Sequence, residues 1–205
     1  IKYLCGAGYY SESLEYYNKI NPEIAFNPSI QNEVVKSYME LNKPDSARIY
    51  LAARLLSERG DKIVLNCMMA ETYITEELED SAFVFLDRAV KSYKERAKNY
   101  QKKGKEPILP NCFLSPCYSF ADLLWKKGKI QQASQYYMIV EPLMKEMVKT
   151  PIRMELQIKA LTNFSSFCRE TKQYEKALDL LARRDSVLQT YLEFKAKNDK
   201  KNYAE

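Results

Sequence analysis

The sequence contains no histidine among its 205 residues, and this absence excludes several kinds of active site. Triads of the Ser-His-Asp type and Cys-His pairs both need an imidazole as the general base. Zinc sites that use histidine are excluded for the same reason. We therefore expect neither an enzyme of these classes nor a histidine-ligated metal.

Glycine is also scarce, and neither Gly-Lys pair completes a phosphate-binding loop. Gly104-Lys105 and Gly128-Lys129 both lack the glycine five residues upstream that such a loop requires. No dinucleotide-binding fingerprint occurs either. We interpret the acidic pairs Glu76-Glu77 and Glu79-Asp80 as solvated helix ends and not as acid–base carboxylates. The sequence predicts a protein without catalytic activity, cofactor or metal.

The cysteines do not form a recognisable pattern. They are odd in number, irregularly spaced and without histidine to complete a zinc site. The five residues are Cys5, Cys67, Cys112, Cys117 and Cys168. We expect free, core-type thiols, with a Cys112–Cys117 pair as the open alternative. Cysteine usage therefore says little about the compartment.

Long apolar runs are missing as well, and no stretch of 18 uncharged apolar residues is present. With 5 glycines, 8 prolines and 29% charged residues, the composition favours helix, and we expect no strands. An apolar fraction of 46% is enough to bury a core. Because the chain opens at Ile1 without a methionine or a signal pattern, we expect a processed protein or an excerpt of a longer one.

What the sequence does contain is a repeat. The strings GYYSESLEYY (8–17) and KQYEKALDLL (172–181) both place an aromatic residue three before a small one and a large apolar residue four after it. The small residue, here called the marker, recurs in similar surroundings at Ser13, Ala47, Ala82, Ala133 and Ala177. Successive markers are 34, 35, 51 and 44 residues apart. A period of about 34 residues indicates two antiparallel helices per repeat, and the longer gaps indicate insertions.

Helix boundaries agree with this period. Three N-cap residues followed by proline predict starts of first helices: Asn27-Pro28, Ser115-Pro116 and Thr150-Pro151. Five residues before a marker stands a residue suited to a left-handed turn, namely Gly8, Asn42 or Gly128.

These strings resemble the tetratricopeptide repeat (TPR) family, above all in GYYSESLEYY, GKIQQASQYY and QYEKALDLL. The resemblance implies an all-α, TPR-like α-α superhelix (solenoid) of about five helix-turn-helix repeats, forming a single domain over 1–205. It also implies a protein or peptide partner in a concave groove lined by the first helices. The family's inner positions carry over to these groove candidates: Asn32, Lys36, Met39, Cys67, Glu71, Tyr118, Asp122, Trp125 and Arg169.

Two of these candidates are aromatic. Tyr118 and Trp125 share one helical face with Asp122 between them, which suggests an anchor pocket for a ligand. The alternative is that Trp125, the single tryptophan, packs on a neighbouring helix.

The C-terminal part has a narrower resemblance. The last repeat runs through 185–188 into a long charged helix (185–205), as in TPR sensor regions of membrane-anchored regulators in Bacteroidota. This implies an input domain with a histidine kinase or DNA-binding output domain downstream, and a membrane contact only outside this chain. The location would then be periplasmic; for a free-standing adaptor, the alternative, it would be cytoplasmic. A homodimer is left open.

A basic stretch supplies the rival interpretation. Residues 91–106 carry seven cations against two anions, with tyrosines interleaved, which is a pattern that can bind nucleic acid. The favoured interpretation is a helix extension, with Tyr93, Ala97 and Tyr100 packed inward and the lysines in water. After it, residues 98–111 are expected to form the longest irregular connection, so that 91–112 is a basic helix extension and loop. Nucleic acid is accordingly not the expected partner.

Overall fold

The structure, a computed structural model, describes residues 1–20, 27–57, 60–104, 111–145 and 150–202. Every regular element within these ranges is a helix, as the composition predicts, and none of these helices is long and apolar enough to cross a membrane. The elements are α1 (Lys2–Gly6), α2 (Tyr10–Tyr17), α3 (Pro28–Glu40), α4 (Pro44–Leu56), α5 (Lys62–Thr75), α6 (Glu79–Lys102), the short 3-10 helix η2 (Asn111–Phe113), α7 (Leu114–Lys126), α8 (Ile130–Lys145), α9 (Pro151–Glu170) and α10 (Tyr174–Asn202).

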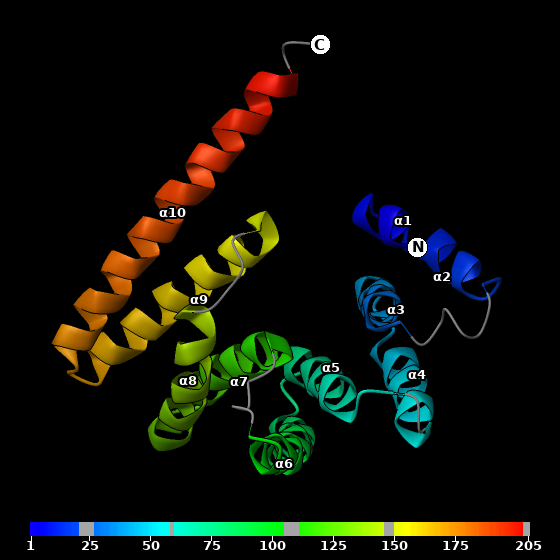
Figure 1. Cartoon of the computed structure of the whole chain (residues 1–205), viewed down its shortest axis with the longest axis horizontal. Coiled ribbons are helices and arrows are strands. Elements are labelled where there is room, and N and C mark those ends of the chain that lie inside the picture. The colour runs from blue at the N-terminus through cyan, green and yellow to red at the C-terminus, as the bar shows by residue number, and fades with distance from the viewer. Residues whose placement is uncertain (21–26, 58–59, 105–110, 146–149, 203–205) are drawn as a thin grey trace. The chain divides into compact units, whose positions relative to one another are not determined.

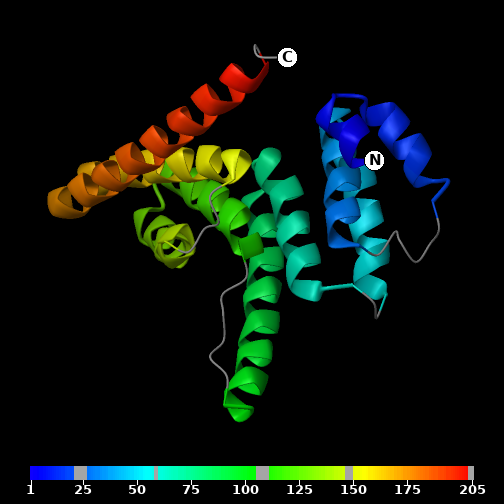
Figure 2. The ribbon, with the colours of Figure 1, turned by 45° about the horizontal axis from the view of Figure 1, so that its top comes forward.

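Consecutive helices form antiparallel hairpins, and the views in Figure 1 and Figure 2 agree on the pairs α5/α6 and α9/α10. All five markers lie on second helices, one each on α2, α4, α6, α8 and α10. Each marker is buried, Ala177 being the most exposed at 6%. A small side chain at these points lets the neighbouring helix approach closely, because a larger one would need space that the core does not have.

The hairpin turns share one geometry. In each turn the middle residue has a positive φ, at Gly8, Asn42, Glu77, Gly128 and Lys172. The residue after it donates its N–H to a carbonyl five residues back, as Lys43 does to Tyr38 at 2.9 Å and Gln173 does to Cys168 at 2.8 Å. This is the Schellman motif, which closes the first helix and reverses the chain. The sequence predicts Gly8, Asn42 and Gly128 at these positions, whereas the structure adds Glu77 and Lys172.

Two of the three predicted helix starts are confirmed. Asn27 caps α3 by accepting the Ser29 N–H at 2.9 Å, and Thr150 precedes α9, which begins at Pro151. The third start is wrong by two residues, because α7 begins at Leu114. Pro116 therefore lies inside the first turn, where the N–H groups have no partner within the helix and a proline is tolerated.

The chain divides into two compact units, Ile1–Phe120 and Ala121–Glu205, each with its own core. In the first unit a buried cluster joins α3, α4 and α5 through Val35, Ala47, Leu51, Leu65, Met68 and Met69. In the second unit Tyr137 of α8 stacks on Phe164 of α9, with ring centroids 4.6 Å apart, and also contacts Phe167.

The two insertions in the repeat spacing lengthen helices. α6 has 24 residues and continues to Lys102, so the irregular connection predicted from residue 98 begins later, near the left-handed Gly104. The rest of that predicted connection, 105–110, lies outside the described residues. α9 has 20 residues, which accounts for part of the second insertion. α10 has 29 residues, most of them after the last marker, and its end extends past α9 in Figure 1.

Candidate functional site

A polar groove, here called the inner groove, lies on the first helices of the first unit. Its volume is about 530 Å³. α3 supplies Asn32, Val35, Lys36, Met39 and Glu40, α5 supplies Glu71, Thr72, Ile74 and Thr75, and α7 supplies Ser115 and Ser119. Four of the groove candidates from the sequence, Asn32, Lys36, Met39 and Glu71, are thus brought together.

Both signs of charge meet in the inner groove. Lys36 and Glu40 are exposed, while Glu71 is half-buried. Burial raises the pKa of the Glu71 carboxyl, and a hydrogen bond from the Ser115 hydroxyl partly offsets this. The groove can therefore offer a cation, carboxylates, an amide and several hydroxyl groups to a ligand.

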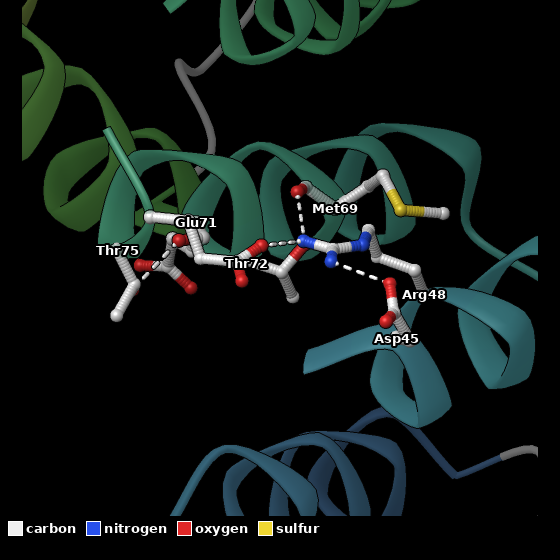
Figure 3. A network of polar contacts seen from close by, with 7 residues as sticks. Asp45, Arg48, Met69, Glu71, Thr72 and Thr75 are labelled. Carbon is white, nitrogen blue, oxygen red and sulfur yellow. Dashed lines mark hydrogen bonds and ion pairs between the residues drawn. The ribbon is translucent and has the colours of Figure 1, made fainter. Parts of the chain in front are cut away.

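An ion-pair network holds α4 against α5, which supplies four of the residues that line the inner groove. Arg48 of α4 donates to Asp45 at 2.7 Å (Figure 3). It also donates to Glu76 at the end of α5. The Arg48 guanidinium also lies 4.7 Å from the ring centre of Tyr73. Because the Arg48 side chain is only 14% exposed, these contacts are less screened than a surface pair.

The helix hydroxyls in the groove are partly committed to α5 itself. Thr72 donates to the Met69 carbonyl at 2.8 Å and Thr75 to the Glu71 carbonyl at 2.9 Å, which leaves their oxygens as acceptors (Figure 3). Sequence reasoning missed Thr72, Thr75, Ser115 and Ser119 as lining residues. Their spacing of one helical turn on α5 and on α7 is the signal that could have identified them.

The aromatic anchor suggested by the sequence is not an open pocket. Tyr118 is 2% exposed and belongs to the core of the first unit. In the second unit the Trp125 ring meets Phe167 edge-to-face at 5.8 Å and its Nε1 donates to Glu170 at 3.0 Å, so the packing alternative describes it. Asp122 accepts hydrogen bonds from the Tyr137 hydroxyl and the Asn163 amide, which makes it part of a network between helices.

The remaining candidate in the first unit, Cys67, is also not exposed to the groove. It is buried beside Cys112, and its pKa is raised because the Cys112 thiol hydrogen bond and burial both favour the neutral form. All five cysteines are free thiols, including Cys112 and Cys117. No group of three or more metal-ligating side chains occurs among the residues described.

The second unit has a groove of its own, here called the terminal groove, with a volume of about 430 Å³. It contains the last candidate, Arg169. The lining residues are Thr162, Ser165, Ser166 and Arg169 of α9 and Tyr174, Ala177, Leu178, Leu181 and Arg184 of α10.

The basic stretch on α6 is only partly the solvated face that we expected. Lys91, Lys94 and Lys98 are exposed, and Tyr93 packs edge-to-face on Phe113 at 6.1 Å. Tyr100, by contrast, is 44% exposed, so its predicted inward packing is wrong.

Comparison with known proteins identifies the fold. No protein-family model matches the chain, and no curated protein matches its sequence. A structure of MamA from MSR-1 superposes with a TM-score of 0.52 over 91% of this chain and 91% of that one, at 14% identity. A crystal structure of a candidate kinesin light chain from Podosopora anserina, with nearly identical TPR-like repeats, superposes with a TM-score of 0.55 over 94% and 92%, also at 14% identity. The chain therefore has an all-α TPR-like repeat fold.

Proposed function

We propose that this protein is a protein-interaction module that binds an extended peptide segment of a partner in the inner groove. The observation that carries the proposal is the convergence of α3, α5 and α7 on one polar groove. Helical repeats use such surfaces for recognition because side chains one turn apart project from successive first helices.

The chemistry of the groove suits a peptide. An extended backbone presents N–H and C=O groups, which the Asn32 amide and the Ser119 hydroxyl can bond. Lys36 can pair with a carboxylate of the ligand, and Glu40 with a cation. Met39 and Ile74 add apolar surface for a side chain between these polar contacts.

A random-sequence peptide display library, selected on the 205-residue chain, tests this proposal. We expect selected peptides to bind the unmodified protein, and Lys36→Glu to weaken peptides that carry an acidic residue by about tenfold or more. Lys94→Glu makes the same change of charge on exposed α6 and serves as the matched control, with no expected effect. If Lys36→Glu binds the selected peptides as the unmodified protein does, the inner groove is not the binding surface.

We further infer that the module is the input part of a signalling or transcriptional regulator, with α10 carrying the response. What supports this is the length of α10, whose residues from Leu192 to Lys197 are exposed although helical. Hydrogen exchange with and without a selected peptide should then show changed protection in α10. Unchanged exchange along all of α10 would favour the free-standing adaptor instead.

Nucleic acid is the second candidate partner, favoured only by the exposed lysines of α6 and by Tyr100. Binding of mixed oligonucleotides would weaken steeply with salt, and Lys94→Glu with Lys98→Glu would reduce it. If no binding is detected at low salt, this alternative is removed.

A further inference from the structure

The terminal groove lies on a face of α10 that has counterparts in the other repeats. Counting from the marker, the residue four positions on is Leu51 in α4, Tyr137 in α8 and Leu181 in α10. The residue one position on is Arg48 in α4 and Leu178 in α10. Helices with the same marker alignment present the same faces, so these positions can be compared directly.

In the two earlier repeats a helix covers this face. Leu51 is completely buried in a cluster with Leu65 and Met69 of α5. Tyr137 is completely buried against Phe164 and Phe167 of α9. In both units, therefore, the next helix covers this face with apolar or aromatic side chains.

On α10 the same face is open in the part of the chain that the structure describes. Leu178 is 67% exposed and Tyr174 is 60% exposed, and Leu181 is only half-buried. These three residues form one wall of the terminal groove. Exposed apolar side chains gathered in one groove mark an interaction site more often than scattered ones do.

Two arginines give this groove a positive character. Arg169 on α9 is exposed, and Arg184 on α10 donates through Nε and Nη2 to Asp185 at 2.9 and 2.6 Å. A guanidinium has five N–H donors, so Arg184 can take a second carboxylate. On α4 an arginine at the position of Leu178, Arg48, bonds Glu76 at the end of the covering helix, so an ion pair between this face and the helix that covers it has a precedent in the first unit.

We propose that the terminal groove binds an amphipathic α-helix of another polypeptide, which packs an apolar stripe on Tyr174, Leu178 and Leu181 and pairs acidic side chains with Arg169 and Arg184. The site is separate from the inner groove and does not depend on the function proposed for it. A helix is the occupant because helices cover the equivalent faces, and acidic side chains follow from the two arginines.

The probe is a synthetic helical peptide of about 14 residues, or four turns, with leucines on one stripe and glutamates beside it. A second peptide replaces the glutamates by lysines, and a third redistributes the leucines so that no stripe remains. Binding is measured by fluorescence anisotropy with the full chain. Leu178→Glu is the test variant, and Phe83→Glu is its matched control, because Phe83 occupies the same position after its marker on α6 and is also exposed.

We expect the glutamate peptide to bind best, and Leu178→Glu to weaken it about tenfold or more, while Phe83→Glu binds normally. Arg169→Glu with Arg184→Glu should weaken the glutamate peptide and strengthen the lysine peptide, a reversal that misfolding cannot produce. Helix content from circular dichroism checks that each variant is folded.

Three outcomes would overturn the proposal. The first is that neither striped peptide binds or that both bind equally. The second is that Leu178→Glu binds as the unmodified protein does. The third is that the unmodified chain sediments as a dimer without peptide and Leu178→Glu as a monomer, because the occupant would then be a second copy of this chain.

Discussion

At the scale of single residues, Asp61 links two elements. Its carboxylate caps α5 by accepting the Ile63 N–H at 3.0 Å, and it accepts from Arg96 of α6 at 2.8 Å. Burial favours the neutral acid, but the Arg96 guanidinium and the Ile63 N–H outweigh it, so the pKa of Asp61 is lowered. One side chain therefore ties the start of α5 to the lysine-rich extension of α6.

This lowered pKa gives a pH-dependent prediction. A depressed pKa contributes stability above the unfolded value of about 3.9, and that stability is lost as the pH falls through the folded pKa. Asp61→Asn removes the charge but keeps a capping side chain, so we expect a loss of about 0.5–1 kcal/mol at pH 7, a modest value because both partners are partly exposed. Urea unfolding at decreasing pH should show this difference shrinking as the pH falls through the lowered pKa of Asp61 and vanishing below it.

Asp61→Ala is the companion variant, because it removes the cap as well as the charge. It should cost about 1 kcal/mol more than Asp61→Asn, and that part should persist at low pH. A difference between Asp61→Asn and the unmodified protein that stays constant with pH would show that the ion pair with Arg96 contributes nothing.

At the scale of elements, the five hairpin turns show one backbone geometry built from different residues. Glycine occupies the positive-φ position in two turns and asparagine in one, at low cost. Lys172 occupies the same position with φ of 62°, although lysine neither lacks a Cβ, as glycine does, nor tolerates this conformation as asparagine does. A side chain with a Cβ is strained in this conformation, so the turn between α9 and α10 forms because the packing on both sides requires it.

Replacing Lys172 by glycine should therefore stabilise the protein. We expect a gain of about 0.5–1 kcal/mol in the free energy of unfolding, since Lys172 is exposed and the change removes only the backbone strain. Lys172→Ala keeps the Cβ and should give no gain. Gly128→Ala should lose about 1 kcal/mol for the same reason. A Cβ added at Gly128 would meet no atom within 4 Å, so only the φ of 75° makes the substitution unfavourable. Equal stability of Lys172→Gly and Lys172→Ala would contradict the strain.

The same comparison shows what the sequence could and could not predict. The spacing of the markers was enough to place the hairpins, because a turn must lie five residues before each small residue. At Gly8 the residue type itself predicts the turn, because glycine suits a positive φ. Lysine does not, so the turn at Lys172 can be predicted only by aligning the repeats. The inner-face register also predicted Lys36, Glu71 and Tyr118 as neighbours on one groove, and the structure brings Lys36 and Glu71 together there while Tyr118 lies in the core. An aromatic residue on a helix packed from several sides is drawn into the core, and one repeat's sequence does not specify its neighbours.

At the scale of the whole molecule, stability in a repeat protein is a sum of the repeats and their nearest-neighbour contacts. The two compact units, Ile1–Phe120 and Ala121–Glu205, each contain buried markers. Trp125, the single tryptophan, packs on Phe167 within the second unit, so its fluorescence reports on the packing of that unit. Circular dichroism reports on the helices of both.

Enlarging a marker in either unit should therefore have separable effects. Ala47→Leu and Ala133→Leu each overpack a completely buried site, which costs about 1–3 kcal/mol. Ala133→Leu should move the urea midpoint of Trp125 fluorescence to lower concentration. Ala47→Leu should move the circular dichroism transition but shift the Trp125 midpoint less, and Ala52→Leu, on the exposed face of α4, should leave both unchanged. If Ala47→Leu and Ala133→Leu displace the Trp125 midpoint equally, the chain unfolds as one cooperative block and the two units are not independent in stability.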